Sequence, residues 1–217
     1  MKRILLTGFE PFQQESINPS WEAVKQLDGQ IIGNYEVMAR CLPTAFYPAK
    51  SQIKSYFHEL SPEVVICIGQ AGGRPDITLE RIAINLIDAR IPDNDGESPI
   101  DVPVEADSPA AYWTNLPIKA MRSAIQGVGV PCSISYTAGT YVCNSTFYAL
   151  MHTIEQFGQN CRGGFIHIPF LPEQSVEHAG KASMSLDDMV RGLRAAIAAV
   201  DSEEIVQVSA GTLHHEQ

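Results

Sequence analysis

One cysteine of this sequence lies where a predicted strand turns through a glycine into an amphipathic helix. Segment 135–144 contains Gly139 and ends with Cys143 and Asn144, close to the expected start of the helix. Unpaired backbone N–H groups and the positive end of the helix dipole favour a thiolate, which predicts a pKa for Cys143 lowered from about 8.5 toward neutrality. The same N–H groups could donate hydrogen bonds to an oxyanion. The alternative is a small buried apolar residue, as most free cysteines are.

A histidine lies within the apolar strand predicted for residues 165–168. Pro169 follows and terminates this strand, which places His167 near the edge of the sheet where ligands usually bind. An imidazole at that edge could act as the general base for a nearby nucleophile. The alternative is a hydrogen-bonded core histidine without a catalytic role.

A carboxylate lies in segment 77–84, whose residues alternate along a predicted strand. The alternation puts Glu80 on the same face as Ile82 and Ile84, with Arg81 on the opposite face. A carboxylate on an apolar face needs a partner. An imidazole would be one, giving an acid that orients the base that activates the nucleophile. The alternative is a solvated glutamate on an edge strand beside Arg81.

Predicted strands and helices alternate along the chain. Short apolar runs that end at turn residues predict strands, and apolar residues at three- or four-residue spacing predict helices. Such alternation is typical of an α/β fold with a largely parallel sheet, helices on both faces and catalytic groups at the carboxyl ends of the strands. The predicted strands are residues 4–6, 35–42, 64–68, 77–84, 133–137 and 165–168, and the predicted helices are residues 21–27, 49–60, 118–125, 146–157 and 186–200.

Local signals also predict where some segments begin and end. Gly158 is a plausible stop for the fourth helix, and Ser185 with Asp188 three residues later is a capping pattern for the last one. Segment 88–107 carries seven acidic residues and three prolines, so regular structure is not expected there. This long loop is either a lid or subunit contact, or a solvated excursion.

The composition is that of an ordinary globular chain. Its 217 residues are 45% hydrophobic and fit one domain, residues 1–217. The formal net charge of -10 argues against nucleic acid or an anionic membrane as partner. The five cysteines are sparse and form no CxxC pair, and no apolar run is long enough for a signal peptide or a membrane span. We therefore expect a cytoplasmic protein, in a reducing compartment where a reactive thiol persists.

Two longer stretches resemble the signatures of a known family. Residues 69–85, which read GQAGGRPDITLERIAIN, resemble the glutamate signature of pyroglutamyl peptidase I, and residues 135–144 with Tyr148 resemble its cysteine signature. The resemblance extends along nearly the whole chain, through segments 7–12, 18–20, 88–94 and 167–169, and is weakest after Val200.

The resemblance implies roles for the three candidate residues. Cys143, His167 and Glu80 would be the nucleophile, the base and the third member of the site. The enzyme would be a cysteine exopeptidase, an omega peptidase that hydrolyses the amide bond after an N-terminal pyroglutamyl residue through a thioester acyl-enzyme. The resemblance further implies a single-domain three-layer sandwich with a mixed, mostly parallel twisted sheet. It also implies no metal and no cofactor, and usually a homotetramer.

Pyroglutamate is a neutral lactam, so its pocket should be apolar with a few hydrogen-bonding groups. In the resembling family, phenylalanines at the positions of Phe9 and Phe12 flank the lactam ring, although ordinary packing would also explain two loop phenylalanines. The resemblance adds three further residues to the wall of the pocket. These are Ile91, Tyr141 and Val142.

Two polar residues are further candidates. Gln70, in a glycine-rich turn, could present backbone or amide groups to the lactam, or could be an ordinary turn residue exposed to water. Arg90 could help the backbone amide of Cys143 to stabilise the oxyanion, or could form a salt bridge with Asp88 or Asp93.

Two other functions compete with the peptidase. The first is a cysteine hydrolase of the same architecture that acts on another N-acyl or lactam substrate. The second is a non-catalytic sensor in which Cys143 is only a responsive thiol, although such a sensor needs neither Glu80 nor His167.

Overall fold

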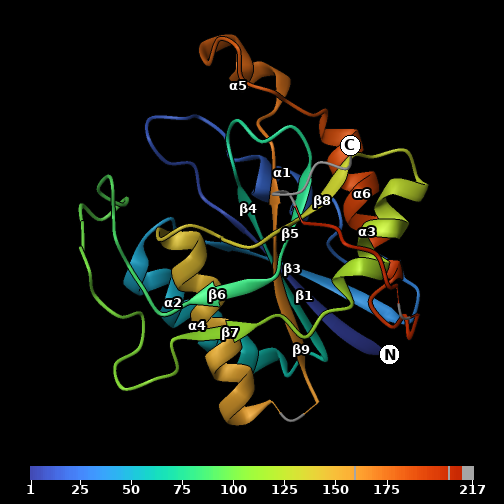
Figure 1. Ribbon diagram of the computed structural model, residues 1–217, viewed down its shortest axis with the longest axis horizontal. Helices are drawn as coiled ribbons and strands as arrows, with labels where there is room; N and C mark the ends of the chain where they lie inside the picture. Colours follow the sequence, from blue (N-terminus) through green and yellow to red (C-terminus); the bar gives the residue numbers. More distant parts are fainter. Residues whose placement is uncertain (159, 205, 212–217) are drawn as a thin grey trace.

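The computed structural model describes residues 1–158, 160–204 and 206–211. It shows a twisted sheet covered by helices on both faces, with a short two-stranded sheet beside it (Figure 1). The strands of the main sheet are β1 (Lys2–Phe9), β2 (Ile31–Ile32), β3 (Tyr35–Leu42), β4 (Val64–Gln70), β5 (Ile77–Glu80), β8 (Cys132–Ser135) and β9 (Arg162–Ile168), and the small sheet pairs β6 (Ile82–Ile84) with β7 (Ala111–Trp113). The helices are α1 (Pro19–Lys25), α2 (Phe46–Leu60), α3 (Ile118–Gly127), α4 (Val142–Phe157), α5 (Pro172–Glu177) and α6 (Leu186–Ala198).

The main sheet is mixed but mostly parallel, as predicted. Its strand order is β2-β3-β1-β4-β9-β5-β8, and β3, β1, β4 and β9 are parallel neighbours. β5 is antiparallel to β9 and parallel to β8. β9 therefore lies between β4 and β5, and its His167 is in register with Gly69 on one side and Thr78 on the other.

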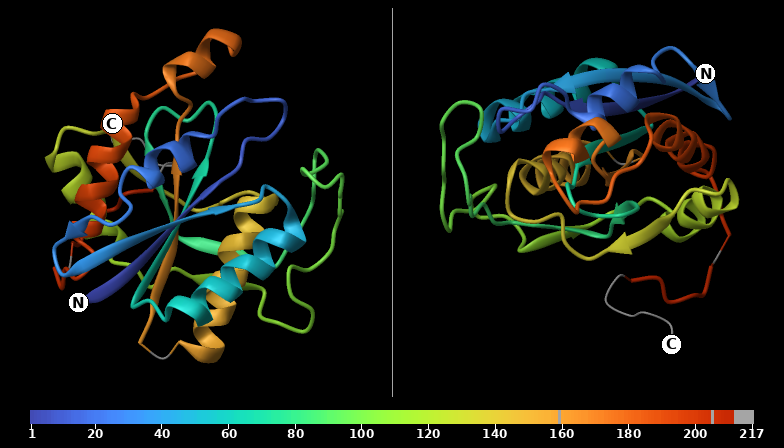
Figure 2. Two further views of the ribbon diagram at one scale, coloured as in Figure 1. Left: turned by 180° about the vertical axis from the view of Figure 1, so that it is seen from behind. Right: turned by 90° about the horizontal axis from the view of Figure 1, so that it is seen from above.

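Apolar side chains on both faces of the sheet hold the layers together. In β1, Ile4 and Leu6 pack in one core cluster and Leu5 packs in the other, because successive side chains point to opposite faces. Helices α1, α3 and α6 cover the first face, and α2 and α4 cover the second, as the views in Figure 2 show. A strand buried on both faces reads as a continuous apolar run, which is why residues 4–6 and 64–68 were recognisable.

The single strand predicted for residues 77–84 is wrong, because the chain leaves the main sheet at Arg81. The backbone N–H of Arg81 donates to the carbonyl of Ser135 at 2.9 Å, while Ile82 already pairs with Trp113 in the small sheet. Glu80 therefore does not share a strand with Ile82. It ends β5, between β9 and β8, and is not on an edge strand.

Several boundaries agree with the local signals. Gly158 is the C-cap of α4, and the Ser185 side chain accepts from the N–H of Asp188 at the start of α6. Helix α4 begins at Val142, four residues before the predicted start, so Cys143 lies in its first turn. The short elements α5, β2 and β7 were not predicted, since periodicity is hard to detect in so few residues.

Segment 88–107 contains no helix or strand, as expected, but buried polar contacts fix it to the body of the molecule. The carboxylate of Asp93, 7% exposed, accepts from the backbone N–H of Phe46 at the start of α2 and from those of Asp95 and Glu97. Glu105 forms ion pairs with lysines of α2. The loop is drawn in green at the left of Figure 1.

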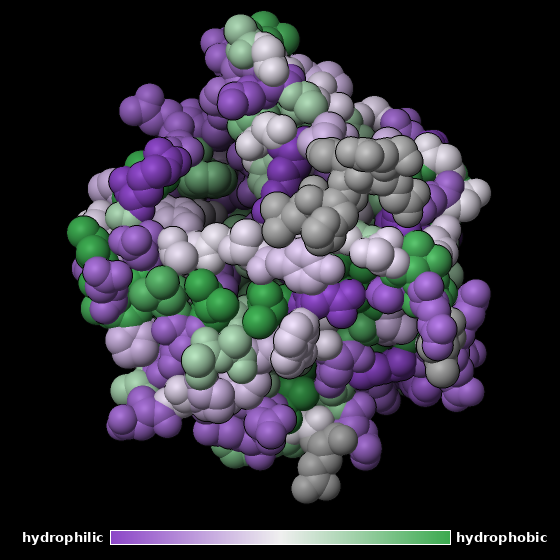
Figure 3. All heavy atoms as spheres, in the orientation of Figure 1, coloured by the Kyte–Doolittle hydropathy of each residue, from purple (hydrophilic) through white to green (hydrophobic). Residues whose placement is uncertain are grey.

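The surface shown in Figure 3 mixes hydrophilic and hydrophobic side chains and is hollowed in its upper left part. Among the described helices, not one has the length and apolar character that crossing a membrane requires.

Candidate active site

The first turn of α4 holds the Cys143 side chain over β4. Tyr141 is the N-cap of this helix and Cys143 is its second residue. A methyl group added at Gly69 would lie 2.9 Å from the Cys143 sulfur and 2.8 Å from the ring of Phe165, so only glycine leaves room for the sulfur. Because Gly69 is in register with His167, the sulfur lies above the strand pair that carries the imidazole.

Asn144 fastens the start of α4 to the segment after Glu80. This residue is fully buried, and its side chain exchanges three hydrogen bonds with backbone groups. The amide nitrogen donates to the carbonyls of Ile84 and Leu86 at 2.9 and 3.0 Å, and the amide oxygen accepts from the N–H of Ile84 at 3.0 Å. The helix turn that presents Cys143 is thereby fixed.

His167 and Glu80 form a buried pair. The Nδ1 of His167 lies 2.7 Å from Oε1 of Glu80, and the two residues are 4% and 0% exposed. Since a carboxylate only accepts, Nδ1 carries the proton and Nε2 is left for other partners. Burial acts to raise the pKa of the Glu80 carboxyl, but the hydrogen bond and charge of His167, with the charge of Arg74, hold that pKa below its ordinary value.

Arg74 is a residue of this site that sequence reasoning missed. Its Nη1 donates to Oε1 of Glu80 and to Oγ1 of Thr78, each at 2.6 Å, and its Nη2 donates to the carbonyl of Thr137 at 3.2 Å. The signal that could have found it is its position inside the 69–85 stretch, six residues before a carboxylate that needs a partner.

The expected lowering of the Cys143 pKa is wrong for the protein without substrate. The residue keeps partial exposure to the pocket, yet burial of the sulfur raises the pKa of the thiol to about 12, and the negative charge of Glu80 acts in the same direction. Arg74 and the backbone N–H of Cys143 itself oppose this shift without overcoming it. The Cys143 thiol is therefore neutral until a base takes its proton.

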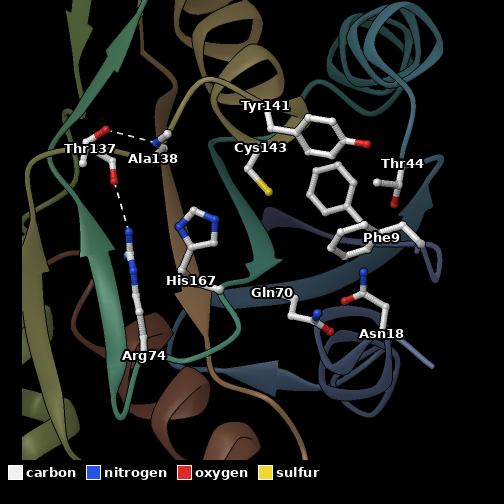
Figure 4. Close-up of a pocket in the computed structure, with 13 residues that line it drawn as sticks. Phe9, Asn18, Thr44, Gln70, Arg74, Thr137, Ala138, Tyr141, Cys143 and His167 are labelled. Carbon is white, nitrogen blue, oxygen red and sulfur yellow. Dashed lines mark hydrogen bonds between the residues drawn. The ribbon is translucent and has the colours of Figure 1, made fainter. Parts of the chain in front are cut away.

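A pocket of about 280 Å³ opens beside the sulfur, at the hollow seen in Figure 3. Figure 4 shows Cys143 and His167 pointing into it between two walls. One wall contains Phe9 and Tyr141, and the opposite wall contains Arg74, Thr137 and Ala138. Phe12, whose ring centroid lies 6.4 Å from that of Tyr141, and Gly139 also line the pocket. No aspartate or glutamate is among the residues that line the pocket. In the described part of the chain, no three His, Cys, Asp or Glu side chains converge as a possible metal site.

The structure brings some of the predicted pocket residues together and leaves others outside. Phe9, Phe12, Gln70 and Tyr141 line the pocket with Cys143 and His167. By contrast, Val142 is fully buried in the core beneath α4, Ile91 is partly buried, and Arg90 is exposed. These last three are not among the lining residues, although the charge of Arg90 acts on the hydroxyl of Tyr141.

Two polar residues of the pocket, Asn18 and Thr44, were not predicted as site residues. Both donate to the carbonyl of Glu10, at 3.0 and 2.7 Å, and so hold the loop that carries Phe12. The Asn18 side chain also caps α1 by accepting from the N–H of Ser20. An asparagine before a proline at a helix start was the available signal, but it indicates a cap and not a ligand contact.

We expect Gly69→Ala to reduce kcat about 100-fold. The new methyl group must displace the Cys143 sulfur, and moving a reacting group by about 1 Å lowers the rate by about that factor. Hydrolysis of a substrate and thermal unfolding are measured together. Gly127→Ala is the matched control, since an added methyl group there meets open space near the end of α3. Full activity of Gly69→Ala would show that the sulfur position is not critical.

The known proteins that are similar to this chain are named pyroglutamyl or pyrrolidone-carboxylate peptidases. A family profile described as pyroglutamyl peptidase matches residues 2–203. A pyrrolidone-carboxylate peptidase of Bacillus cereus (strain Q1) is 51% identical over 215 residues, which cover 99% of this chain and all of the relative, and one of Bacillus anthracis is 52% identical over the same length.

Solved structures agree with these relatives. The crystal structure of pyroglutamyl peptidase I from Bacillus amyloliquefaciens matches with a TM-score of 0.92 and 46% identity, over 96% of this chain and 99% of that one. The pyrrolidone carboxyl peptidase of Thermococcus litoralis matches with a TM-score of 0.89 and 42% identity, over 92% and 93% of the two chains. By sequence along its whole length and by fold, the chain belongs to the pyroglutamyl peptidase family.

Proposed function

We propose that this chain hydrolyses the amide bond after an N-terminal pyroglutamyl residue, with Cys143 as nucleophile, His167 as general base and acid, and Glu80 as the orienting carboxylate. The observation that carries the proposal is the 2.7 Å pair of His167 and Glu80, placed so that the imidazole and the Cys143 sulfur face one pocket. Membership of a family of cysteine peptidases supports the same chemistry.

The pocket suits a neutral lactam. Phe9, Phe12 and Tyr141 offer aromatic surface, while Gln70 and Asn18 offer a few hydrogen-bonding groups. A free α-amine would be bound best by a carboxylate, and the lining contains none. A pyroglutamyl residue has no free α-amine, so this lining favours it over an unblocked N-terminal residue.

Acylation begins when Nε2 of His167 takes the proton of the Cys143 thiol as the sulfur attacks the pyroglutamyl carbonyl. A raised thiol pKa makes this proton transfer necessary. A carbon–sulfur bond forms and the carbonyl becomes an oxyanion, which the N–H groups at the start of α4 stabilise. His167 then protonates the departing amine, the carbon–nitrogen bond breaks, and a thioester remains.

Deacylation uses the same groups. His167 removes a proton from water, which attacks the thioester, and free pyroglutamate leaves as the Cys143 sulfur is protonated again. We assign an auxiliary role at the oxyanion to Arg90, whose exposed side chain is close enough for its charge to act on the Tyr141 hydroxyl. Ile91 and Val142 would support the pocket wall from behind.

The test is hydrolysis of a pyroglutamyl chromogenic amide, compared with the glutamyl and prolyl amides of the same chromophore. We expect only the pyroglutamyl amide to be cleaved, and iodoacetamide to modify one thiol unless a pyroglutamyl inhibitor is present. The Cys41 thiol, partly exposed, should react slowly because burial raises its pKa to about 11. Cleavage of another N-acyl amide alone would favour the rival hydrolase, and no cleavage would favour the thiol sensor.

We further propose that residues 1–217 form one peptidase domain that acts on N-terminally pyroglutamylated peptides as a homotetramer in the cytoplasm. The main sheet carries Glu80 and His167, and α4 packs on it with Cys143, which supports one domain. The tetramer follows from the family resemblance. The sparse free cysteines support a reducing compartment.

A further inference from the structure

A guanidinium in the pocket wall contacts the Glu80 carboxylate of the candidate catalytic pair, and the hydrolytic mechanism gives it no role. Arg74 lies on the turn between β4 and β5 and shares one carboxylate oxygen with the imidazole. Both its Nη1, at 2.6 Å, and Nδ1 of His167, at 2.7 Å, contact Oε1 of Glu80. The other oxygen, Oε2, is buried and has no hydrogen-bond partner among the described residues. The nearby Ser135 hydroxyl donates to the carbonyl of Thr137 at 3.0 Å, and its interaction with Glu80 is a minor contribution to the lowered pKa of that carboxyl.

Because two donors contact the same oxygen, they fix the orientation of the Glu80 carboxylate. Without Arg74, the carboxylate could rotate and offer either oxygen to His167, or could draw water toward Oε2. Arg74 is itself held in place, because Nη1 also donates to Thr78 on β5 and Nη2 donates to the carbonyl of Thr137. The guanidinium therefore joins β5 to the segment that leads into Cys143.

Arg74 also balances the charge of the pair. Glu80 is fully buried, and a buried carboxylate is stable only with a compensating charge or several donors. His167 supplies a full positive charge only when protonated, whereas Arg74 is always charged. With Arg74 in place, the carboxylate stays ionised while the imidazole is neutral, which is the form that a general base needs.

We propose that Arg74 is a positioning residue of the hydrolytic site, which fixes the Glu80 carboxylate toward His167 and keeps it ionised beside a neutral imidazole. This inference rests on the proposed function. It adds a residue that lines the pocket wall and acts on the reacting groups through Glu80.

The proposal predicts a shift in the pH dependence. In the described residues, the titratable and charged groups around the imidazole and the sulfur are Glu80 from β5, Cys143 from α4, Cys67 from β4, Tyr141 and Arg74. Removing the positive charge leaves Glu80 unopposed, which favours the protonated imidazole. It also removes a contribution that lowers the pKa of the Cys143 thiol. Because His167 is the base for a neutral thiol, the first change moves the acidic limb of the rate profile to higher pH, and the second lowers the rate.

The experiment measures kcat/KM against pH for the wild type, Arg74→Gln and Arg74→Lys, with a pyroglutamyl chromogenic amide as substrate. For Arg74→Gln we expect a loss of roughly 10- to 100-fold near neutral pH and an acidic limb higher by about one pH unit. Arg74→Lys should recover the position of the limb, because it restores the charge, but only part of the rate, because an ammonium cannot reproduce the planar fork.

Lys181→Gln is the matched control, because the exposed Lys181 side chain packs near Gly73 on the same turn without bonding Glu80. It should leave both the limb and the rate unchanged. A merely structural Arg74 would lower the amount of folded protein, measured by thermal unfolding and thiol titration, without moving the limb. An unmoved limb in folded Arg74→Gln would overturn the inference, whereas a wild type inactive on the substrate would overturn the proposed function itself.

Discussion

The Cys143→Ser protein is expected to lose at least about 10⁴-fold in kcat on a pyroglutamyl chromogenic amide, because removing a nucleophile disables every step that depends on it. A serine hydroxyl is far less acidic than a thiol, and this pocket already disfavours the ionised nucleophile, as the raised pKa of the Cys143 thiol, about 12, shows. Substrate affinity should change little, since the pocket walls remain. The measurement is steady-state hydrolysis, with inhibitor binding to the variant followed by calorimetry.

Cys41→Ser is the matched control, because it makes the same chemical change at a cysteine of similar partial exposure in β3. It should keep wild-type kinetics and wild-type labelling by iodoacetamide. Substantial activity in Cys143→Ser, with binding intact, would mean that another group attacks the substrate.

A second large effect is expected for Glu80→Gln, with a loss of kcat of roughly 10² to 10⁴-fold. The amide can keep the shape of the carboxylate but not its charge, so the imidazolium that forms during acylation loses its stabilising partner. The amide N–H₂ could also face Nδ1 and impose the wrong tautomer of His167. The measurements are the hydrolysis rates and the near-ultraviolet circular dichroism spectra of the variant and the wild type. Because Arg74 loses its charged partner in the variant, we expect its side chain to become more accessible to solvent.

The same substitution should change how stability depends on pH. The pKa of Glu80 is lowered in the folded chain, so its ionised pair adds stability at neutral pH that is lost as the pH falls through the folded value. Glu80→Gln should remove this part of the acid dependence, as urea unfolding at several acidic pH values would show.

Glu105→Gln tests whether the effect is specific to the site. Glu105 also has a pKa below its ordinary value, because its hydrogen bond and ion pair with Lys54, with the help of Lys50, outweigh partial burial. Glu105 lies in segment 88–107 and not in the pocket. Removing its charge should therefore reduce the free energy of unfolding slightly and leave kcat unchanged. Equal losses of activity in the two variants would argue against a special role for Glu80.

The sequence indicated the chemistry of the site better than its geometry. Local patterns made Cys143, His167 and Glu80 candidates, as a thiol at a helix start and two polar groups in apolar strands. Each pattern also had a non-catalytic alternative, and only the family resemblance implied their roles. Their meeting point could not be derived from local patterns. It depends on β9 inserting between β4 and β5, and strand order is a property of the whole chain.

Other predictions were wrong because contacts between distant parts of the chain outweighed the local sequence pattern. Alternation through Arg81 predicted one strand, but the chain changes sheets there. The helix start predicted an acidic thiol, but enclosure of the Cys143 sulfur outweighs the helix dipole, which is a modest and easily screened effect. The apolar run predicts a strand that ends at residue 68, whereas β4 continues to Gln70 and Gly69 makes space for the sulfur.

The place of β9 also bears on how the protein is made. Among the strands of the main sheet it is the last to leave the ribosome, yet it occupies an interior position and contributes the imidazole. Until it is released, β4 and β5 have no strand to join them, and the Cys143 thiol lacks the base that we propose for it. The proposed site can therefore form only after β9 has been made and inserted into the sheet, late in the folding of the domain.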